Sequence, residues 1–382
     1  MPHTTAFYQW KARVDTLFDA LAPHHRATLA HYTFGLILAR SCGLTAVVVH
    51  LVALLGLKAH ALRARLRELY QPAAAQRGCA RSEFDFSLCF APLARWAAGT
   101  HPDKRLVLAL DPTNLTDRFR VLCVAVLYRG CGLPVAWAVQ GAHEKGSWNA
   151  VWFDLLGKLK AALGDGWTVL VLTDRGLESP DLFRVIVRLG WHPLMRVKRC
   201  AKFRPANWRA GYPLSHFAAH VGARWSGTGI AYPTGACLPC TLLASWEVGH
   251  DEPWLLLTDL PASAVNPAWY AWRMWIEQGF RTFKRGGWGW HRTQMCEPMR
   301  VARLWAVLAV ATVYAVEVGG EAGPAHLPPV RGPLSRVKRG LLWIWAALLN
   351  REPMPTGTIQ HHDWPKTTTT ADILLEPYVH EG

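Results

Sequence analysis

Two aspartates each follow an apolar stretch that is typical of a buried β-strand. Asp111 comes directly after residues 106–110 (LVLAL), and Asp174 comes directly after residues 167–173. Each aspartate taken alone suits a turn or a helix cap. If the two strands are neighbours, both carboxylates lie at one edge of a sheet, where the sites of such sheets are often built. Paired carboxylates are hard oxygen ligands, so this arrangement predicts a site for Mg²⁺ or Mn²⁺.

A third carboxylate, Glu277, belongs to a segment at 267–283 that has helical periodicity. At about 100° per residue, one face of this helix is entirely polar. That face carries Tyr270, Arg273, Glu277, Arg281 and Lys284. A polar face usually meets solvent, but one carboxylate among three cations and a tyrosine also suits a metal ligand beside a nucleic-acid backbone. The opposite face is expected to pack on the sheet through Trp272, Trp275, Ile276, Gly279 and Phe283.

The composition of the chain favours a polyanionic partner. Its 382 residues include 42 lysines and arginines against 27 acidic residues, which gives a formal net charge of +15. A hydrophobic fraction of 51% excludes disorder over most of the chain and is ample for two to three domains. The 20 tryptophans suit either buried cores or stacking on bases that have left a duplex.

Cysteine usage and hydropathy bound the compartment. The 9 cysteines are scattered and odd in number, which suits reduced thiols in a cytoplasm. Cys237 and Cys240 form an isolated pair, for which we expect buried thiols rather than a structural zinc site. The apolar runs at 44–57 and 304–316 fall below the roughly 20 residues of a membrane helix, and early charges interrupt any secretory signal. We therefore expect a cytoplasmic protein with no membrane partner.

The N-terminal region, residues 1–98, is expected to be helical. An apolar helix at 47–55, a turn at Gly56 and a basic helix at 58–70 have the layout of a DNA-binding helix-turn-helix. Basic helices on plain solvated surfaces are common, so the pattern is equally compatible with an ordinary surface.

From residue 103 the pattern changes to strands. The expected order is three strands, a helix, a strand, a helix and a strand, at 106–110, 119–128, 133–139, 147–163, 167–172, 181–189 and 192–198. This order predicts an α/β fold with a mixed sheet and helices on its faces. Residues 200–265 are rich in glycine and proline and indicate a β-rich insertion. Helices return at 266–320, and a C-terminal helical region and tail at 321–382 includes the low-complexity run 367–370.

These residues resemble a known family. Tyr270-x2-Arg273-x3-Glu277-x6-Lys284 resembles the signature of bacterial insertion-sequence transposases of the DDE type, in the group with the YREK motif that is named for the fourth insertion sequence. LeuAspPro at 110–112 and ThrAspArgGly at 173–176 resemble the two aspartate motifs of that family, in the same order. GluProMetArg at 297–300 resembles the stretch after its signature helix. The resemblance covers residues 100–320 well and both ends loosely.

Two positions depart from the family pattern. Many members have aspartate where this chain has Glu297, and an aromatic residue often stands where this chain has Leu177. We interpret Leu177 as a packing residue with no consequence for the metals.

The resemblance implies a ribonuclease-H-like catalytic domain at 103–199 and 266–320, interrupted by the insertion at 200–265. It implies that Asp111, Asp174 and Glu277 are catalytic and bind two divalent ions, Mg²⁺ or Mn²⁺, per active site. Two metals flanking a phosphorus atom can activate an attacking hydroxyl and stabilise the leaving oxygen. Tyr270, Arg273 and Lys284 would then hold phosphates of the transposon end.

The same resemblance implies the substrate and the reaction. The expected partner is double-stranded DNA, namely terminal inverted repeats and target DNA, bound by a homodimer in the nucleoid of a bacterial cytoplasm. The enzyme would cleave both ends and join their 3′ ends to the target. Members of the group can pass through a hairpin, helped by an aromatic side chain that holds a flipped base. Trp225, Trp246 and Trp254 are candidates for this role, although a core position suits each of them better when it is taken alone.

Further cations extend the expected DNA surface. The segment after the fifth strand is too dense in cations for an ordinary surface, and we interpret it as backbone-binding. It contains Arg196, Lys198, Arg199, Lys202, Arg204 and Arg209. With Arg281 and the basic stretch 336–339, these positions suggest DNA laid across a carboxylate site. Two alternatives stay open: a metal-dependent nuclease of the same fold, and a non-catalytic remnant that binds DNA.

Overall fold

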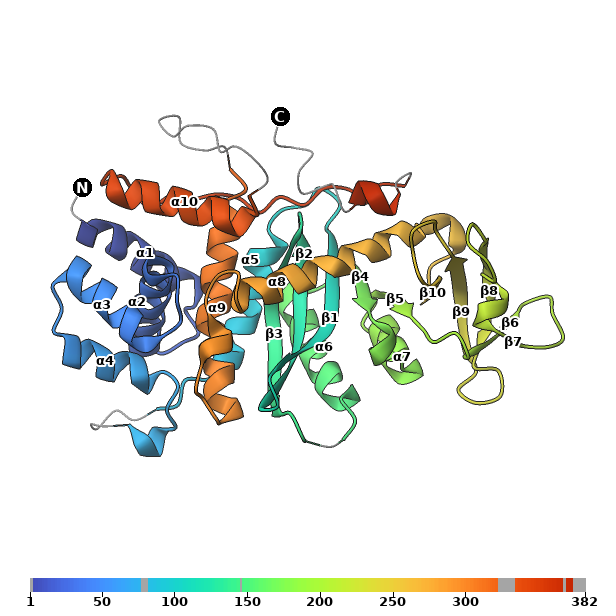
Figure 1. Cartoon of the computed structure of the whole chain (residues 1–382), viewed down its shortest axis with the longest axis horizontal. Helices are drawn as coiled ribbons and strands as arrows, with labels where there is room; N and C mark the ends of the chain where they lie inside the picture. Colours follow the sequence, from blue (N-terminus) through green and yellow to red (C-terminus); the bar gives the residue numbers. More distant parts are fainter. Residues whose placement is uncertain (1–2, 77–81, 145, 322–333, 367–368, 374–382) are drawn as a thin grey trace.

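The computed structural model describes residues 3–76, 82–144, 146–321, 334–366 and 369–373 (Figure 1). Cys79 and the first half of the low-complexity run, 367–368, lie outside the described residues. The fold is mixed α/β, with N-terminal helices and one 10-stranded mixed sheet in the order β3-β2-β1-β4-β5-β10-β9-β8-β6-β7.

The expected N-terminal helices are present. They are α1 (His3–Leu17), α2 (Pro23–Ala39), α3 (Leu44–Leu55), α4 (Ala59–Glu68) and α5 (Phe90–Ala98). Gly56 ends α3 in the left-handed region at φ 63°, which glycine adopts without strain, and its amide donates to the Val52 carbonyl. Leu62 and Leu66 bury one face of α4 and leave its arginines outside. The predicted pair of helices around Gly56 is therefore confirmed.

The central strands follow the predicted order. They are β1 (Arg105–Leu115), β2 (Phe119–Tyr128), β3 (Cys131–Gly141), β4 (Thr168–Thr173) and β5 (His192–Arg196), with α6 (Asn149–Leu163) after β3 and α7 (Pro180–Arg188) after β4. The first three strands form an antiparallel meander, and β1, β4 and β5 run parallel. Strand β1 is longer than expected. It does not end at Leu110, because pairing with β2 continues from Asp111 opposite Cys123 to Leu115 opposite Phe119.

The β-rich insertion continues the same sheet. Its strands are β6 (Lys202–Pro205), β7 (Tyr212–Pro213), β8 (Arg224–Ala231), β9 (Leu238–Ser245) and β10 (Trp254–Thr258). Strand β10 returns to pair antiparallel with β5, so the insertion extends the sheet away from the N-terminal helices (Figure 1). The expected pair of buried thiols is wrong for Cys237, which is exposed in the turn before β9, whereas Cys240 within β9 is buried. The eight cysteines among the described residues are free.

A further pair of helical segments carries the chain back across the sheet. The 3₁₀ helix η6 (Pro267–Arg273) leads into α8 (Met274–Phe283), which crosses one face while α5 and α6 lie on the other (Figure 1). A Cβ on Gly279 would lie 2.3 Å from the Gly132 carbonyl oxygen of β3. Absence of a side chain therefore lets α8 approach the sheet at this point. Trp275, Ile276 and Phe283 are buried beside it, as predicted.

Helix α9 (Pro298–Val318) is the core of the molecule and packs against α2, α10 (Arg336–Leu349) and β3. Within the described residues it is long and apolar enough to cross a membrane, and α2 with α3 would pass the same test as one span, although they bend by 95°. The whole apolar window of α9 is buried inside the protein. Two charged side chains within the helix are paired: Arg303 with Glu83 at 2.7 Å and Glu317 with Arg13 at 2.6 Å.

Candidate active site

The sheet register brings the two aspartates together. Parallel pairing of β1 with β4 ends at Leu110 opposite Thr173. Asp111 and Asp174 are the residues that directly follow this last pair, so they lie side by side at the same level of the sheet. Asp111 remains in β1 through its pairing with β2, while Asp174 precedes the short helix η3 (Arg175–Leu177). The predicted convergence of the two residues at one place on the sheet is therefore observed.

Glu277 joins them from the first turn of α8, and Arg273 lies between the carboxylates. Arg273 Nη1 is 3.4 Å from Asp111 Oδ1, and Arg273 Nη2 donates to Glu277 Oε1 at 3.3 Å. The exposed fractions of the side chains are 13% for Arg273, 15% for Asp111 and 38% for Glu277. One guanidinium group thus bridges two of the three carboxylates in a largely buried setting.

The carboxylates repel one another. The pKa of Asp111 is raised to about 6, chiefly by burial; Arg273 opposes the rise, and Asp174 and Glu277 add to it. Burial also acts on Arg273, but Tyr270 and the three carboxylates outweigh it and raise the pKa of that guanidinium. Burial thus outweighs the arginine at Asp111, and a further cation beside this carboxyl group would favour its charged form.

The donor chemistry fits a divalent ion, although the side chains do not form a closed cage. Three carboxylates are the hard oxygen ligands that Mg²⁺ and Mn²⁺ prefer, and the raised pKa of Asp111 marks a place where added positive charge is favourable. Across the described ranges, no group of three or more His, Cys, Asp or Glu side chains is close enough to hold a metal ion as it stands. Arg273 occupies the space between Asp111 and Glu277.

Tyr270 differs from its prediction. The structure buries it to 3% exposure, because its side of η6 packs against the end of β4 and against Trp254 instead of meeting solvent. Its hydroxyl donates to the Thr173 carbonyl at 3.4 Å, and Trp254 packs edge-on against its ring at 5.3 Å. Burial raises its pKa well above the ordinary value. The Tyr270 hydroxyl thus links η6 to the end of β4, next to Asp174.

An open groove of about 840 Å³ runs beside the carboxylates. Asp111 and Glu277 line it together with the cations Arg281, Lys284 and Arg285 and with Asn114, Thr113 and His291. Lys284 follows α8, and its Nζ donates to Thr113 Oγ1 at 2.9 Å. Burial lowers the pKa of Lys284. Sequence reasoning missed Asn114 and His291, although the polar run after Leu110 signalled that β1 continues past Asp111 with side chains suited to a groove.

The cations after β5 divide into two kinds. Arg196 is paired, because its Nη2 lies 3.2 Å from Glu252 Oε2, which Arg175 shares at 2.7 Å. In contrast, Lys198, Arg199 and Lys202 are exposed. The Arg175–Glu252 ion pair links the second aspartate motif to the insertion and was not predicted from the sequence.

The three candidate tryptophans lie in different surroundings. Trp225 packs against Phe203 and Phe217 at ring distances of 5.8 and 4.6 Å. Trp246 donates its indole N–H to the His250 carbonyl at 2.9 Å and lies under the Arg199 guanidinium at 5.8 Å. Trp254 contacts Tyr270, and this contact links it to the residues around the carboxylates. All three are half-buried.

Comparison with known proteins gives a family match and a structural likeness. The family described as "Transposase DDE domain" matches residues 107–314, more than half of the chain, and the match contains Asp111, Asp174 and Glu277. Among solved structures, the chain is similar to one in the "Cryo-EM structure of piggyBac transposase synaptic complex with hairpin DNA". The sequence identity is 10% and the TM-score 0.40, over 91% of this chain and 79% of that chain. No curated protein matches the chain in sequence.

Proposed function

The chain belongs to the family of transposases with a DDE domain, and from this premise we propose that it cleaves the ends of an insertion sequence and joins the 3′ ends to target DNA. We place it in the group with the YREK signature and assign a ribonuclease-H-like core to its central strands. The strand order β3-β2-β1-β4-β5, with an antiparallel meander followed by two parallel strands, supports this assignment.

One observation carries the proposal. Three carboxylates from separate parts of the chain, Asp111, Asp174 and Glu277, act electrostatically on one another beside a groove lined with cations. A structural site seldom gathers like charges in a half-buried setting, because their repulsion costs stability. A phosphodiester laid along the groove would meet Arg281, Lys284 and Arg285 close to Asp111 and Glu277.

Asp111, Asp174 and Glu277 are the residues that would hold divalent metal. When bound, two Mg²⁺ or Mn²⁺ ions would polarise the scissile phosphate and activate water or a DNA 3′-hydroxyl. The chain's own residues prepare for this. Asp111 and Asp174 are fixed by strand register, and Glu277 by the docking of α8 on Gly132. Arg273 holds Asp111 and Glu277 in place and, on moving from between them, becomes free to bind a phosphate.

We assign Lys284 and Arg281 to phosphate contacts at the groove, and Lys198, Arg199 and Lys202 to contacts farther along the DNA. Tyr270 acts as a positioning residue, since its hydroxyl is engaged by the Thr173 carbonyl. The reaction on two ends calls for a homodimer on paired DNA ends within the bacterial cytoplasm. For a hairpin step, Trp254 is the first aromatic to test because it contacts Tyr270.

The test uses isosteric neutral variants of the three carboxylates. Asp111→Asn, Asp174→Asn and Glu277→Gln should each abolish Mg²⁺-dependent cleavage of duplexes carrying the terminal inverted repeat, while affinity for the same duplex stays within about tenfold. Arg188→Gln, on the exposed end of α7, is the matched control and should keep both activities. Cleavage that survives in all three variants would contradict the assignment.

The products separate the two alternatives. Cleaved 3′ ends that are never joined to a second duplex would identify a nuclease of the same fold. Duplex binding without any cleavage by the unaltered protein, over a range of Mg²⁺ and Mn²⁺ concentrations, would identify a DNA-binding remnant.

A further inference from the structure

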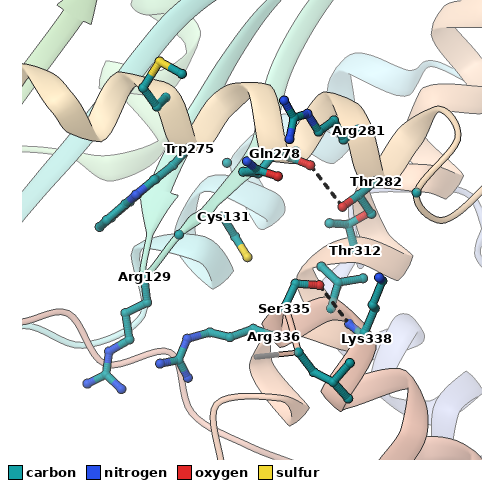
Figure 2. A pocket seen from close by; sticks show the side chains of 17 residues that line it. Arg129, Cys131, Trp275, Gln278, Arg281, Thr282, Thr312, Ser335, Arg336 and Lys338 are labelled. Carbon is teal, nitrogen blue, oxygen red and sulfur yellow. Dashed lines mark hydrogen bonds between the residues drawn. The ribbon is translucent and has the colours of Figure 1, made fainter. Parts of the chain in front are cut away.

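A second pocket, of about 340 Å³, lies between the β2–β3 turn, α8 and the first turn of α10 (Figure 2). The described residues that line it include no carboxylate and four cations: Arg129, Arg281, Arg336 and Lys338. The sequence suggests that the stretch 336–339, with Arg336 and Lys338, faces DNA, and no role has yet been assigned to Arg129. The pocket is therefore strongly positive and distinct from the carboxylate groove.

Arg336 is the most unusual of these cations. Its residue is only 5% exposed, and its Nε is buried without a hydrogen-bond partner among the described residues. The Tyr128 ring lies 5.9 Å from its Cζ. Burial lowers the pKa of Arg336, and Arg129 and Arg339 lower it further although Tyr128 opposes them. A buried guanidinium without an anion is costly, so an anion that enters the pocket would be bound favourably.

Arg129 reinforces the same place from the opposite wall. It stands at φ 41° in the tight turn that it forms with Gly130 at φ 83°. Asparagine or glycine is preferred in such a turn, and an arginine in the left-handed region is strained. Its Nε is also buried without a partner, and its Cζ lies 5.7 Å from the Tyr128 ring. Figure 2 shows that the guanidinium groups of Arg129 and Arg336 lie near each other at one side of the pocket.

The amino end of α10 completes the site. Ser335 caps the helix, and its hydroxyl accepts from the Lys338 amide at 3.5 Å (Figure 2). The first-turn amides of this 14-residue helix carry partial positive charge, which favours a bound anion. The pocket is therefore lined by the amino end of α10 and by two arginines whose Nε atoms have no hydrogen-bond partner among the described residues.

The pocket adjoins the carboxylate groove. Arg281 and Gly286 line both, so the end of α8 and the residues after it form a shared wall. We propose that Arg129, Arg336 and the amino end of α10 bind a backbone phosphate of the DNA that lies in the carboxylate groove. This proposal rests on the proposed function for the identity of the polyanion, and it gives the duplex an anchoring point across α8 from the reaction.

The first arm of the test asks whether the pocket binds phosphate at all. Inorganic phosphate, compared with chloride at equal ionic strength, should raise the Tm of the full-length protein by about 2 °C or more. Arg336→Met should lose this rise, and the control Arg188→Met should keep it. Without phosphate, Arg336→Met should be at least as stable as the unaltered protein, because methionine keeps the aliphatic stem and removes an unpaired charge.

The second arm asks whether DNA supplies the phosphate. In titrations of a duplex at several salt concentrations, the slope of log K against log [salt] should become shallower by about 0.9 in Arg336→Met and in Arg129→Met. Arg188→Met should keep the original slope. Arg129→Met also answers the question if Arg336→Met fails to fold.

Three outcomes would overturn the proposal. An equal phosphate response in Arg336→Met and the unaltered protein would show that the pocket does not bind phosphate. A lost phosphate response with an unchanged salt slope would show a site for a free anion instead of DNA. A salt slope and a phosphate response that both persist in Arg129→Met would also contradict it. Neither arm measures cleavage, so failure of the proposed catalytic function is recognised separately.

Discussion

Two arginines at neighbouring grooves meet opposite surroundings. Arg273 lies between Asp111 and Glu277, with ion-pair distances of 3.4 and 3.3 Å. Arg336 is buried more deeply, yet the described residues offer its Nε no hydrogen-bond partner, and the pocket around it contains no carboxylate among its described lining. The end of α8 separates the two grooves.

The difference indicates what each groove is prepared to bind. In the first groove three carboxylates act on the single guanidinium of Arg273, so this site can exchange that guanidinium for metal. In the second the arginines outnumber any anion, so the site gains from a phosphate. A DNA strand with bound metal supplies both kinds of charge. The metal ions would bind on the carboxylate side of α8, and a phosphate would bind in the pocket on its other side.

The largest expected effect comes from disturbing α8, because both grooves depend on it. Gly279→Val should destabilise the protein by about 3 kcal/mol or more, since any Cβ would collide with the Gly132 carbonyl oxygen. Urea unfolding measures the change. Gly157→Ala, in a helix where a Cβ meets nothing within 4 Å, is the matched control and should stabilise the protein by about 0.5–1 kcal/mol. Similar effects of the two substitutions would show that α8 does not depend on this contact.

The direct comparison of the two arginines should give opposite results. Arg273→Met should cost about 2 kcal/mol of unfolding free energy at neutral pH, because it leaves Asp111 and Glu277 without their shared partner. Arg336→Met should change stability by less than about 0.5 kcal/mol or increase it. Both are measured by urea unfolding in chloride buffer without phosphate. Equal losses would remove the distinction between a compensated and an uncompensated arginine.

The carboxylate groove should also show in the pH dependence of stability. The folded-state pKa of Asp111 is raised from 3.8 to about 6, so the folded protein binds more protons than the unfolded chain between these values. Its contribution is therefore present at low pH and is lost as pH rises from about 4 to 6, by about 1–2 kcal/mol. Urea unfolding at several pH values should show this loss in the unaltered protein and not in Asp111→Asn. An identical pH profile for both would exclude Asp111 as its source.

The smallest effect is expected for Arg281, whose side chain lines both the carboxylate groove and the second pocket. Arg281→Gln should reduce the salt slope of duplex binding by about 0.9 and leave stability within about 0.5 kcal/mol, because the side chain is exposed. Fluorescence titration at three salt concentrations gives the slope. If Arg188→Gln reduced the slope equally, the effect would reflect net charge instead of position.

The order of the central elements could be predicted because it depends on local patterns. The apolar runs before Asp111 and Asp174 and the helical period of 267–283 are properties of neighbouring residues, and they predicted a strand before each aspartate. The parallel pairing of β1 with β4 shows that these two strands are neighbours. The spacing of the signature also identified Glu277 as the third carboxylate. The extension of β1 to Leu115 was not predicted, because it depends on pairing with β2.

The surroundings of individual side chains were less predictable. Tyr270 has the polar-face position of an α-helix in sequence, but packing against the end of β4 and against Trp254 buries it. Arg196 belongs to a basic run, yet it pairs with Glu252, far along the chain. Arg336 stands in a basic stretch typical of a surface, and packing of α10 on α9 encloses it.

The sequence alone determined the three carboxylates, the types of elements that carry them and the excess of positive charge. These depend on residue identity and on periodicity over a few turns, which local backbone preferences set. The tertiary structure decided which charges are compensated. Arg273 and Arg336 are the same amino acid, but burial cost and pairing depend on neighbours that distant segments bring together. The assignment of one arginine to a carboxylate site and of the other to an open anion pocket therefore required the folded chain.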